Sequence, residues 1–425
     1  MTALVGRDPS LTVPDRLWTR DFTLYFGART VSLLGDAMMP VAAALAVGAI
    51  YGVSGVGYVL AVWTTPFVIF VLFGGVFADR VGARTMMVGA DVVRIFTQTA
   101  VAVAFLTGVP PLWLLMSASF LSGVAAAMFQ PGVNGMVPLV ARDPQRANGV
   151  LKIADAATQL GGPVLAGLLM ALTGAGAVYL VDAGTFLLSG LCLVLVRLTP
   201  AAGRVGPAGR VGPAGAAGAA GVVKRSTVML DLRRGWTEFR SRSWMWSVIL
   251  IWVFFGVLVF GPYIPLSSRL IGDRLGDAAY GWVMAGLGAG TVLGGLIAIR
   301  FRPSRPLAAG GAAMIGFAFI PLSVTLESPL PLLMAGHLLG GTAWAFWSVM
   351  WSTSVQTQVA PDVLNRVTAY EVAGSVVGVA VGQALVGPVS ELVDPRDLLL
   401  VSTGVSVAVC AALLLSPPVR RLRRA

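Results

Sequence analysis

The sequence predicts an all-α membrane protein in which twelve transmembrane helices form two six-helix bundles related by a pseudo-twofold axis. Three observations predict it: an apolar composition, a regular succession of long apolar runs, and an internal repeat. Hydrophobic residues make up 56% of the 425 residues and charged residues only 12%. Soluble domains carry about a quarter charged residues, so we expect most of this protein's surface to face lipid.

The charge balance and the cysteines exclude several classes of protein. A net charge of +11 would suit nucleic-acid binding, but the basic residues lie in short loops between apolar runs, as in membrane proteins. Cys192 and Cys410 lie inside apolar runs, and no CxxC or Cys/His spacing occurs. We therefore expect no nucleic-acid partner, no disulfide framework, no metal site and no cofactor.

The apolar runs have the length of membrane-spanning helices. About 20 apolar residues are needed to cross the hydrocarbon core as a helix, and barrel strands would be shorter and alternating. Such runs recur twelve times, at 24–50, 56–78, 86–107, 112–137, 149–172, 176–197, 244–270, 280–299, 307–326, 331–353, 367–389 and 397–415.

Arginine and lysine are distributed unevenly between the loops. With a cytoplasmic N-terminus, the outer loops hold only Arg269, Arg274 and Arg396, which are 3 of the 30 basic residues. Because cytoplasmic loops are enriched in positive charge, we expect both termini in the cytoplasm. The first 21 residues lack the apolar region and cleavage site of a signal peptide. Arginine greatly outnumbers lysine, which suggests a GC-rich bacterial genome and hence the bacterial inner membrane.

The chain divides into an N-terminal bundle (1–198), a cytoplasmic linker (199–243) and a C-terminal bundle with a basic tail (244–425). The linker contains RVGPAG twice in tandem and no core-forming residues before 224, which predicts a flexible segment. Residues 229–242 mix Leu, Trp and Phe with Arg. This pattern favours a short amphipathic helix on the inner leaflet over a plain loop.

The two bundles repeat each other in sequence. Gly74-Gly75 closes the second span and Gly294-Gly295 closes the eighth. Parallel repeats related by an axis along the membrane normal are used by transporters to alternate access around a midplane site.

The loop between the second and third spans carries a recognisable motif. Residues 74–87 read GGVFADRVGARTMM, which resembles the major facilitator superfamily signature G-x-L-a-D-r-x-G-r-R/K. The matching residues are Gly75, Ala78, Asp79, Arg80, Gly82 and Arg84. The resemblance implies the major facilitator fold and a switch contact from Asp79 to the start of the eleventh span near Arg366, made when the cytoplasmic side is shut. The alternative is a solvated turn with scattered charges.

The fifth span partly matches the family's antiporter motif, G-x8-G-x3-G-P-x2-G-G. Gly149, Gly162, Pro163 and Gly167 match, and Thr158 and Ala166 are small substitutes. Small residues allow close helix packing and Pro163 kinks the span. The motif favours export, and ordinary small-residue packing is the alternative.

Ser119 stands where drug–proton antiporters of the family carry an Arg in the fourth span, so their usual coupling route is in question.

Longer segments resemble the macrolide- and siderophore-exporting branch of the family: RDFTLYFGARTVSLLGDAMMPVA, ADVVRIFTQ, VPLVARDPQRANGV and VDAGTFLLSG. The resemblance implies a secondary active transporter that exports hydrophobic or amphipathic small molecules by alternating access, as a proton antiporter. Its partners would be the substrate, protons and the bilayer, and the chain would act as a monomer. The alternatives are a nutrient or metabolite importer of the same fold, working by symport, and a membrane sensor that transports nothing.

Ionisable residues at membrane depth are candidates for function. Asp36 lies near the middle of the first span, and Ser32 and Met39 share its helical face. We expect a proton or cationic-substrate site there. A structural ion pair of Asp36 with Arg29 or Arg94 is the alternative.

One face of the tenth span combines indoles with the single histidine. His337, Trp344 and Ser348 fall on a stripe with Gly341 and Trp351. This stripe would line the same cavity and suit a bulky amphipathic substrate. Alternatively, the tryptophans pack against neighbouring helices.

Further charges lie within or near the spans. Asp91 and Arg94 have the spacing of an i,i+3 ion pair. Lys152 and Glu371 hold equivalent positions in the fifth and eleventh spans. Asp91, Arg94, Lys152 and Glu371 are all candidate gate charges. Alternatively, Lys152 and Glu371 could snorkel to the interface. Asp155 and Asp182 are weaker candidates.

No catalytic constellation accompanies these residues. We find no Ser/His/Asp set, no paired catalytic acids and no G-x-x-x-x-G-K-[ST] loop for ATP. We therefore expect no enzymatic activity from the chain.

Overall fold

The computed structural model describes residues 17–141, 144–197, 236–237, 239–359 and 361–423. Within them, the side chains of residues 72–80, 131, 134, 135, 138, 144–146, 148, 149, 152, 356, 361–366, 368, 369 and 372 lie outside the description. The described residues form helices, turns and loops.

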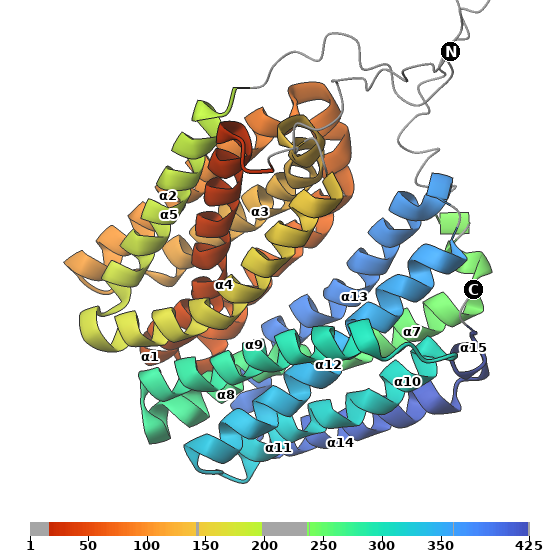
Figure 1. The fold of residues 1–425 in the computed structure, drawn as a ribbon. Helices are drawn as coiled ribbons and strands as arrows, with labels where there is room; N and C mark the ends of the chain where they lie inside the picture. Colours follow the sequence, from red (N-terminus) through yellow and green to blue (C-terminus); the bar gives the residue numbers. More distant parts are fainter. Residues whose placement is uncertain (1–16, 142–143, 198–235, 238, 360, 424–425) are drawn as a thin grey trace, which may run out of the picture.

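The N-terminal half contains five long helices (Figure 1). They are α1 (Arg20–Val81), α2 (Ala83–Thr107), α3 (Leu112–Val140), α4 (Pro144–Thr173) and α5 (Ala175–Leu195).

The C-terminal half is more broken, because two of its crossings each combine several helical pieces. The first is α7 (Ser243–Phe255), the π-helix η1 (Gly256–Phe260) and α8 (Gly261–Leu275). Next come α9 (Asp277–Arg300) and a crossing made of α10 (Pro306–Ala313), the 3-10 helix η2 (Met314–Ala318) and α11 (Phe319–Thr325). The remaining elements are α12 (Leu330–Gln358), α13 (Pro361–Ser390), α14 (Pro395–Leu415) and α15 (Pro417–Arg420).

The described helices include 11 stretches that are long and apolar enough to cross a membrane. The first stretch counts once but contains two crossings, because the backbone at Gly52 leaves the helical conformation (φ 61°, ψ −161°). Both ends of α1 then lie beside the end of α5. The backbone N–H of Arg197 donates to the Asp21 carboxylate (2.9 Å), and Arg84, just beyond α1, donates to the Val194 carbonyl. The prediction of a twelve-helix bundle is thereby confirmed.

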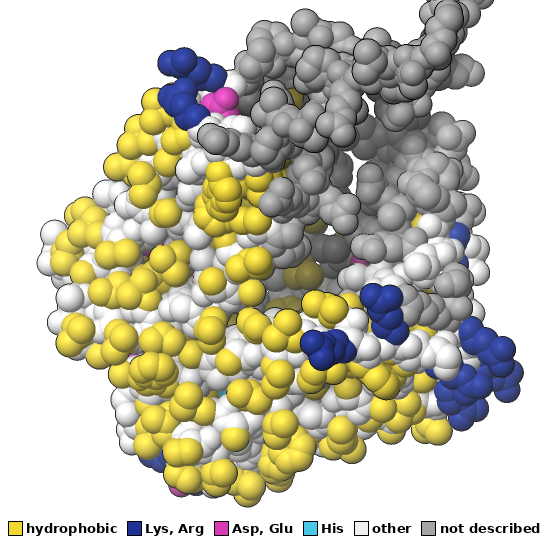
Figure 2. Space-filling view, viewed as in Figure 1, with side chains coloured by type: hydrophobic (Ala, Val, Ile, Leu, Met, Phe, Trp, Pro, Cys, Tyr) yellow, Lys and Arg dark blue, Asp and Glu magenta, His cyan; other side chains and the backbone are white. Residues whose placement is uncertain are grey.

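Large apolar side chains cover the outside of the bundle. Phe96, Leu172 and Ile299 are among those that are mostly exposed, and yellow hydrophobic atoms dominate the face seen in Figure 2. In water such a surface would be costly, so it marks the area that lipid covers.

The two halves touch through glycines of α1 and α13. A Cβ at Gly57 would lie 2.3 Å from the backbone oxygen of Gln383, and one at Gly387 would lie 2.3 Å from the Cα of Ser54. Hydrogen bonds reinforce the contact. The Thr64 hydroxyl lies 2.9 Å from the Gln383 amide, and Ser54 donates to Glu391 (3.4 Å). Only glycine allows backbones to approach this closely.

A second contact between the halves joins α4 and α9. A Cβ at Gly167 would lie 2.9 Å from the Cα of Gly281, and one at Gly288 would lie 2.8 Å from the carbonyl oxygen of Gln159. This contact and the one between α1 and α13 together form what we call the glycine seam, which comprises Gly57, Gly387, Gly167, Gly281 and Gly288.

The seam lies towards one end of the molecule, and the halves diverge towards the other. The diverging end carries the described arginines of the basic loops and tail, and we call it the basic end. They include Arg84, Arg300, Arg302, Arg305 and Arg420. The ribbons separate in that direction in Figure 1, and the space-filling view shows a recess between the halves (Figure 2). We therefore describe the conformation as closed at the seam and open at the basic end.

Candidate functional site

Asp36 is an acidic side chain in the middle of the first crossing that its neighbours leave partly uncovered. Its side chain is 42% exposed, although it lies in the middle of a helix surrounded by others. Gly162 of α4 packs against Ala37, and Asp182 of α5 packs against Gly35. These contacts cover the flanks of α1 at Asp36. The carboxylate is therefore exposed along the edge of α1 that these contacts leave uncovered.

Arg94 of α2 is the basic partner of Asp36. The two side chains are 3.5 Å apart, and Arg94 is only 3% exposed. Its guanidinium lies over the rings of Phe129 (5.3 Å) and Phe186 (4.8 Å). Aromatic faces stabilise a desolvated cation, so this pocket holds Arg94 at the back of the site. The structure thus forms the ion pair that the sequence offered as the alternative for Asp36.

Asp91 does not form the predicted i,i+3 pair with Arg94. It is fully buried, and one carboxylate oxygen accepts a hydrogen bond from Ser189 of α5 (2.7 Å) while the other has no partner. The prediction was wrong because helical spacing shows which residues are within reach on one helix. It does not show a competing carboxylate on a neighbouring helix, here Asp36.

Asp182 adds a third carboxyl group to the same region. It is fully buried, and one of its oxygens has no hydrogen-bond partner. A Cβ at Gly35 would lie 2.1 Å from the other oxygen, and Thr185 lies beside it. Three carboxyl groups from three helices therefore gather around one guanidinium; we call Asp36, Asp91, Arg94 and Asp182 the acidic cluster.

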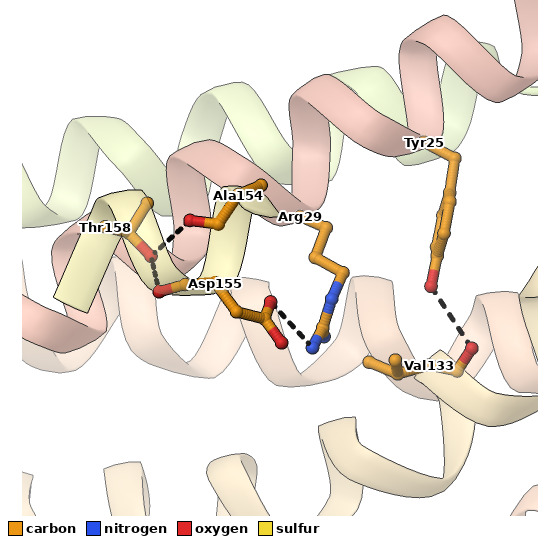
Figure 3. A network of polar contacts seen from close by, with 6 residues as sticks. All are labelled: Tyr25, Arg29, Val133, Ala154, Asp155 and Thr158. Carbon is orange, nitrogen blue, oxygen red and sulfur yellow. Dashed lines mark hydrogen bonds and ion pairs between the residues drawn. The ribbon is translucent and has the colours of Figure 1, made fainter. Parts of the chain in front are cut away.

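A second ion pair lies two helical turns from Asp36. Arg29 of α1 is 3.3 Å from Asp155 of α4, and both are largely buried. Figure 3 shows the pair between an interhelical and an intrahelical contact: Tyr25 donates to the carbonyl of Val133 (3.1 Å), and the Thr158 hydroxyl lies 3.0 Å from the carbonyl oxygens of Ala154 and Asp155 in its own helix. The sequence ranked Asp155 low, although a carboxylate inside an apolar run is itself a signal that a partner is nearby.

The other residues of the predicted cavity face on the first crossing, Ser32 and Met39, are buried or partly buried. Ser32 is 1% exposed and its hydroxyl has no hydrogen-bond partner, and Met39 is partly buried against the core. The expectation that Ser32 lines the cavity with Asp36 is therefore wrong. Close packing of α1 against α4 and α5 leaves a narrower exposed edge than a helical wheel predicts.

His337 is also buried rather than exposed to a cavity. It is 0% exposed, with Nε2 2.5 Å from the Tyr263 hydroxyl and Nδ1 2.7 Å from the carbonyl oxygen of Leu333. Because a carbonyl can only accept, Nδ1 carries a hydrogen and donates it to Leu333. The contact between Nε2 and the Tyr263 hydroxyl joins α12 to α8. This corrects the prediction that His337 belongs to the cavity.

The indoles of α12 pack within the C-terminal half. Trp344 lies edge-on to Trp252 (5.4 Å) and Phe260 (4.8 Å), and Trp351 donates its Nε1–H to Glu371 (2.8 Å). Ser348 is partly exposed. The packing alternative for the tryptophans is therefore the one observed. Glu371 is held by a helix-to-helix hydrogen bond, and its gate role stays a prediction.

We predict that His337→Leu lowers stability without altering proton coupling. The substitution leaves the buried Tyr263 hydroxyl with only the weak acceptor Met284 Sδ, at 3.7 Å, and the loss of the imidazole partner costs about 1–3 kcal/mol. Thermal unfolding in detergent should show the loss, and pH-gradient-driven transport per folded molecule should be unchanged. Loss of coupling at normal stability would contradict this assignment.

The signature loop is described only in part. Gly82 has φ 90°, a conformation that explains the glycine at this position. The side chains of Asp79, Arg80, Lys152 and Arg366 lie outside the description, as do the surroundings of Gly75 and Gly149. The switch contact between Asp79 and Arg366 stays a prediction.

The fifth-span motif places α4 between two other helices. A Cβ at Gly162 would lie 2.5 Å from the Cβ of Ala37, and Gly167 meets Gly281 across the glycine seam. Pro163 lies between these contacts, and its carbonyl oxygen would be 2.8 Å from a Cβ at Gly281. The motif thus packs the first crossing, next to Asp36, on one side and the other half of the molecule on the other.

We predict that Gly162→Leu impairs transport and lowers stability, whereas Gly161→Leu does neither. Nothing lies within 4 Å of a Cβ at Gly161, so the adjacent glycine is a matched control. Forcing a side chain between α4 and Ala37 costs about 1–3 kcal/mol and displaces Asp36. The measurements are the melting temperature and the transport rate of the two variants. Equal values for Gly162→Leu and Gly161→Leu would show that the contact between Gly162 and Ala37 is unimportant.

Comparison with known proteins places this geometry among transporters. The family model of the Major Facilitator Superfamily matches residues 25–371. The chain is 22% identical to the uncharacterised MFS-type transporter YvqJ of Bacillus subtilis, over 82% of this chain and 81% of that protein. It is 19% identical to macrolide efflux protein A of Enterococcus faecalis (77% and 98%) and 25% identical to the multidrug efflux pump Tap of Mycolicibacterium fortuitum (77% and 78%).

Solved structures agree on the fold. The nucleoside transporter NupG superimposes with a TM-score of 0.70 at 12% identity, covering 93% of this chain and 98% of that one. A POT family transporter gives 0.70 at 12% identity, with 95% and 97% covered. At this identity the likeness concerns the fold alone.

Proposed function

Because this chain belongs to the Major Facilitator Superfamily, we propose that it exports hydrophobic or amphipathic small molecules by alternating access, in exchange for protons. The observation that carries the proposal is the exposed carboxylate of Asp36, which is paired with a buried arginine and which we place in the recess between the halves. A carboxylate at such a place can take up a proton or attract a cationic substrate, but not both at once. Competition for one site is the simplest basis for antiport.

Two further observations support export over uptake. The relatives include proteins named for macrolide and multidrug efflux, each matched over more than three quarters of this chain. The fifth-span glycines that resemble the antiporter motif form backbone contacts on both faces of α4. Neither observation identifies the substrate, so the proposal specifies a chemical class: amphipathic molecules, cationic ones among them.

The orientation belongs to the same proposal. The basic end would face the cytoplasm, since positive loops are retained there, and the protein would reside in the bacterial inner membrane. On this orientation the structure is inward-open, with Asp36 accessible from the cytoplasm and the glycine seam closed towards the outside.

Transport direction is the test. Inside-out vesicles from cells that overproduce the protein, acidified inside, should accumulate erythromycin or ethidium, and collapse of the pH gradient should release it. Vesicles that carry the His337→Leu variant serve as a matched control with the acidic cluster intact. Movement of these probes in the opposite direction would favour an importer, and binding without movement would favour a sensor. Either result would overturn the proposal.

A further inference from the structure

The acidic cluster contains more carboxyl groups than its one cation can balance. Arg94 pairs with Asp36, while Asp91 and Asp182 are fully buried and each has one oxygen with no partner. An isolated ionised carboxylate in an apolar interior costs many kcal/mol, and such groups are neutral unless paired. Two carboxyl groups in the cluster therefore require protons.

The two buried acids differ in whether they can reach the cation. Asp182 lies on α5, where it packs against Gly35 of α1 and beside Thr185 of its own helix. Asp91 lies on α2 itself, three residues before Arg94. Residues at this spacing are neighbours on a helix surface, so Arg94 can turn from Asp36 to Asp91 by side-chain rotation alone.

We propose that Asp91 is a second proton-binding site, occupied while Arg94 pairs with Asp36 and emptied when Arg94 turns to Asp91. The inference rests on the proposed function for its role in transport. A cationic substrate that binds Asp36 releases Arg94, which pairs with Asp91. The O–H bond of Asp91 breaks, and its proton leaves through the recess to water. One cation enters and one proton departs, so the charge of the site is conserved.

The charged groups around Asp91 and Arg94 favour exchange of Arg94 between Asp36 and Asp91 over pairing with any other group. Facing Asp91 and Arg94 from α1 are Asp36 and, further away, Arg29, which is engaged with Asp155 of α4. From α5 comes Asp182, and the sequence of α3 contains no titratable side chain. Ser189 fixes the Oδ2 atom of Asp91 at 2.7 Å. The free oxygen, Oδ1, is therefore the atom that holds the proton.

Infrared spectroscopy of the purified protein at neutral pH, with no substrate present, tests the inference. Protonated carboxyl groups give a carbonyl stretch separate from that of carboxylates. We expect one such band to disappear in Asp91→Asn and the same band to disappear in Asp36→Asn, because Arg94 then turns to Asp91 and ionises it. Asp182→Asn should remove a different band. Asp155→Asn, which breaks the neighbouring Arg29 pair, should leave both.

The outcomes separate this inference from the proposed function. Persistence of the Asp91 band in Asp36→Asn, or its absence from the unmodified protein, overturns the second site even if export is observed. Loss of the band in both variants supports the site even if neither probe is transported. Because Asp36 is partly exposed, Asp36→Asn is expected to fold. If Asp91→Asn fails to fold, the loss of the Asp91 band in Asp36→Asn still tests the inference.

Discussion

Asp36→Asn should abolish pH-gradient-driven accumulation of cationic probes while leaving the protein folded and inserted. The substitution removes the charge that attracts a cation and the group that takes up a proton. A hydrogen bond to a charged group is worth about 1.5–3 kcal/mol, so binding of a monocation should weaken roughly 10- to 100-fold. Asn has nearly the shape of Asp, and the side chain is partly exposed, so packing should be preserved.

Probe binding and vesicle transport measure the two effects separately. Asp155→Asn is the matched control, because it also removes one acid from a buried ion pair of the same half but leaves Asp36 and Arg94 in place. It should retain far more transport than Asp36→Asn. Transport by Asp36→Asn at the normal rate, with normal dependence on the pH gradient, would refute the role of Asp36.

Gly57→Leu should hold the transporter open at the glycine seam and stop turnover. Its Cβ would lie 2.3 Å from the backbone oxygen of Gln383 and 2.9 Å from a methyl group of Val386. Overpacking of this kind costs about 1–3 kcal/mol, which is comparable with the free-energy differences between conformations of one protein. The population should therefore shift to the state in which α1 and α13 are apart at this end.

Thiol labelling reports the shift directly. With Cys192 and Cys410 replaced by Ala, a cysteine at position 36 should react with a membrane-impermeant maleimide from the basic side. Adding Gly57→Leu should move that reactivity to the opposite side. Gly89→Leu is the control, since nothing lies within 4 Å of a Cβ at Gly89. Unchanged labelling in Gly57→Leu would contradict the assignment of the closed end.

The fold could be predicted from sequence because it depends on length and hydropathy. Each crossing is an apolar run of membrane length, and the arginine-rich loops alternate with arginine-poor ones. The break at Gly52 falls between the first two predicted spans, 24–50 and 56–78, so here the structure agrees with the prediction. The π-helix at Gly256–Phe260 was not predicted. It lies where Gly256 and Gly261 meet α13 closely, a contact between helices that local sequence does not reveal.

The site could be predicted only one residue at a time. Asp36 stands out because a charge in an apolar run is rare. Its partner, Arg94, was considered but not selected, because the choice between partners depends on helix rotation. The same limit explains Ser32 and His337. Each shares a stripe with cavity candidates, yet small residues on neighbouring helices bring backbones close enough to bury it.

The glycine seam has a consequence for how coupling is enforced. At its five glycines the contacts are mostly backbone against backbone. Separation at these glycines meets little steric resistance, so steric packing there does not by itself prevent the empty protein from changing its open side. Strict exchange must then come from electrostatics: a vacant, unprotonated Asp36 has to make this change unfavourable. A substitution that lowers this free-energy penalty should let protons leak across the membrane even though the helix bundle remains intact.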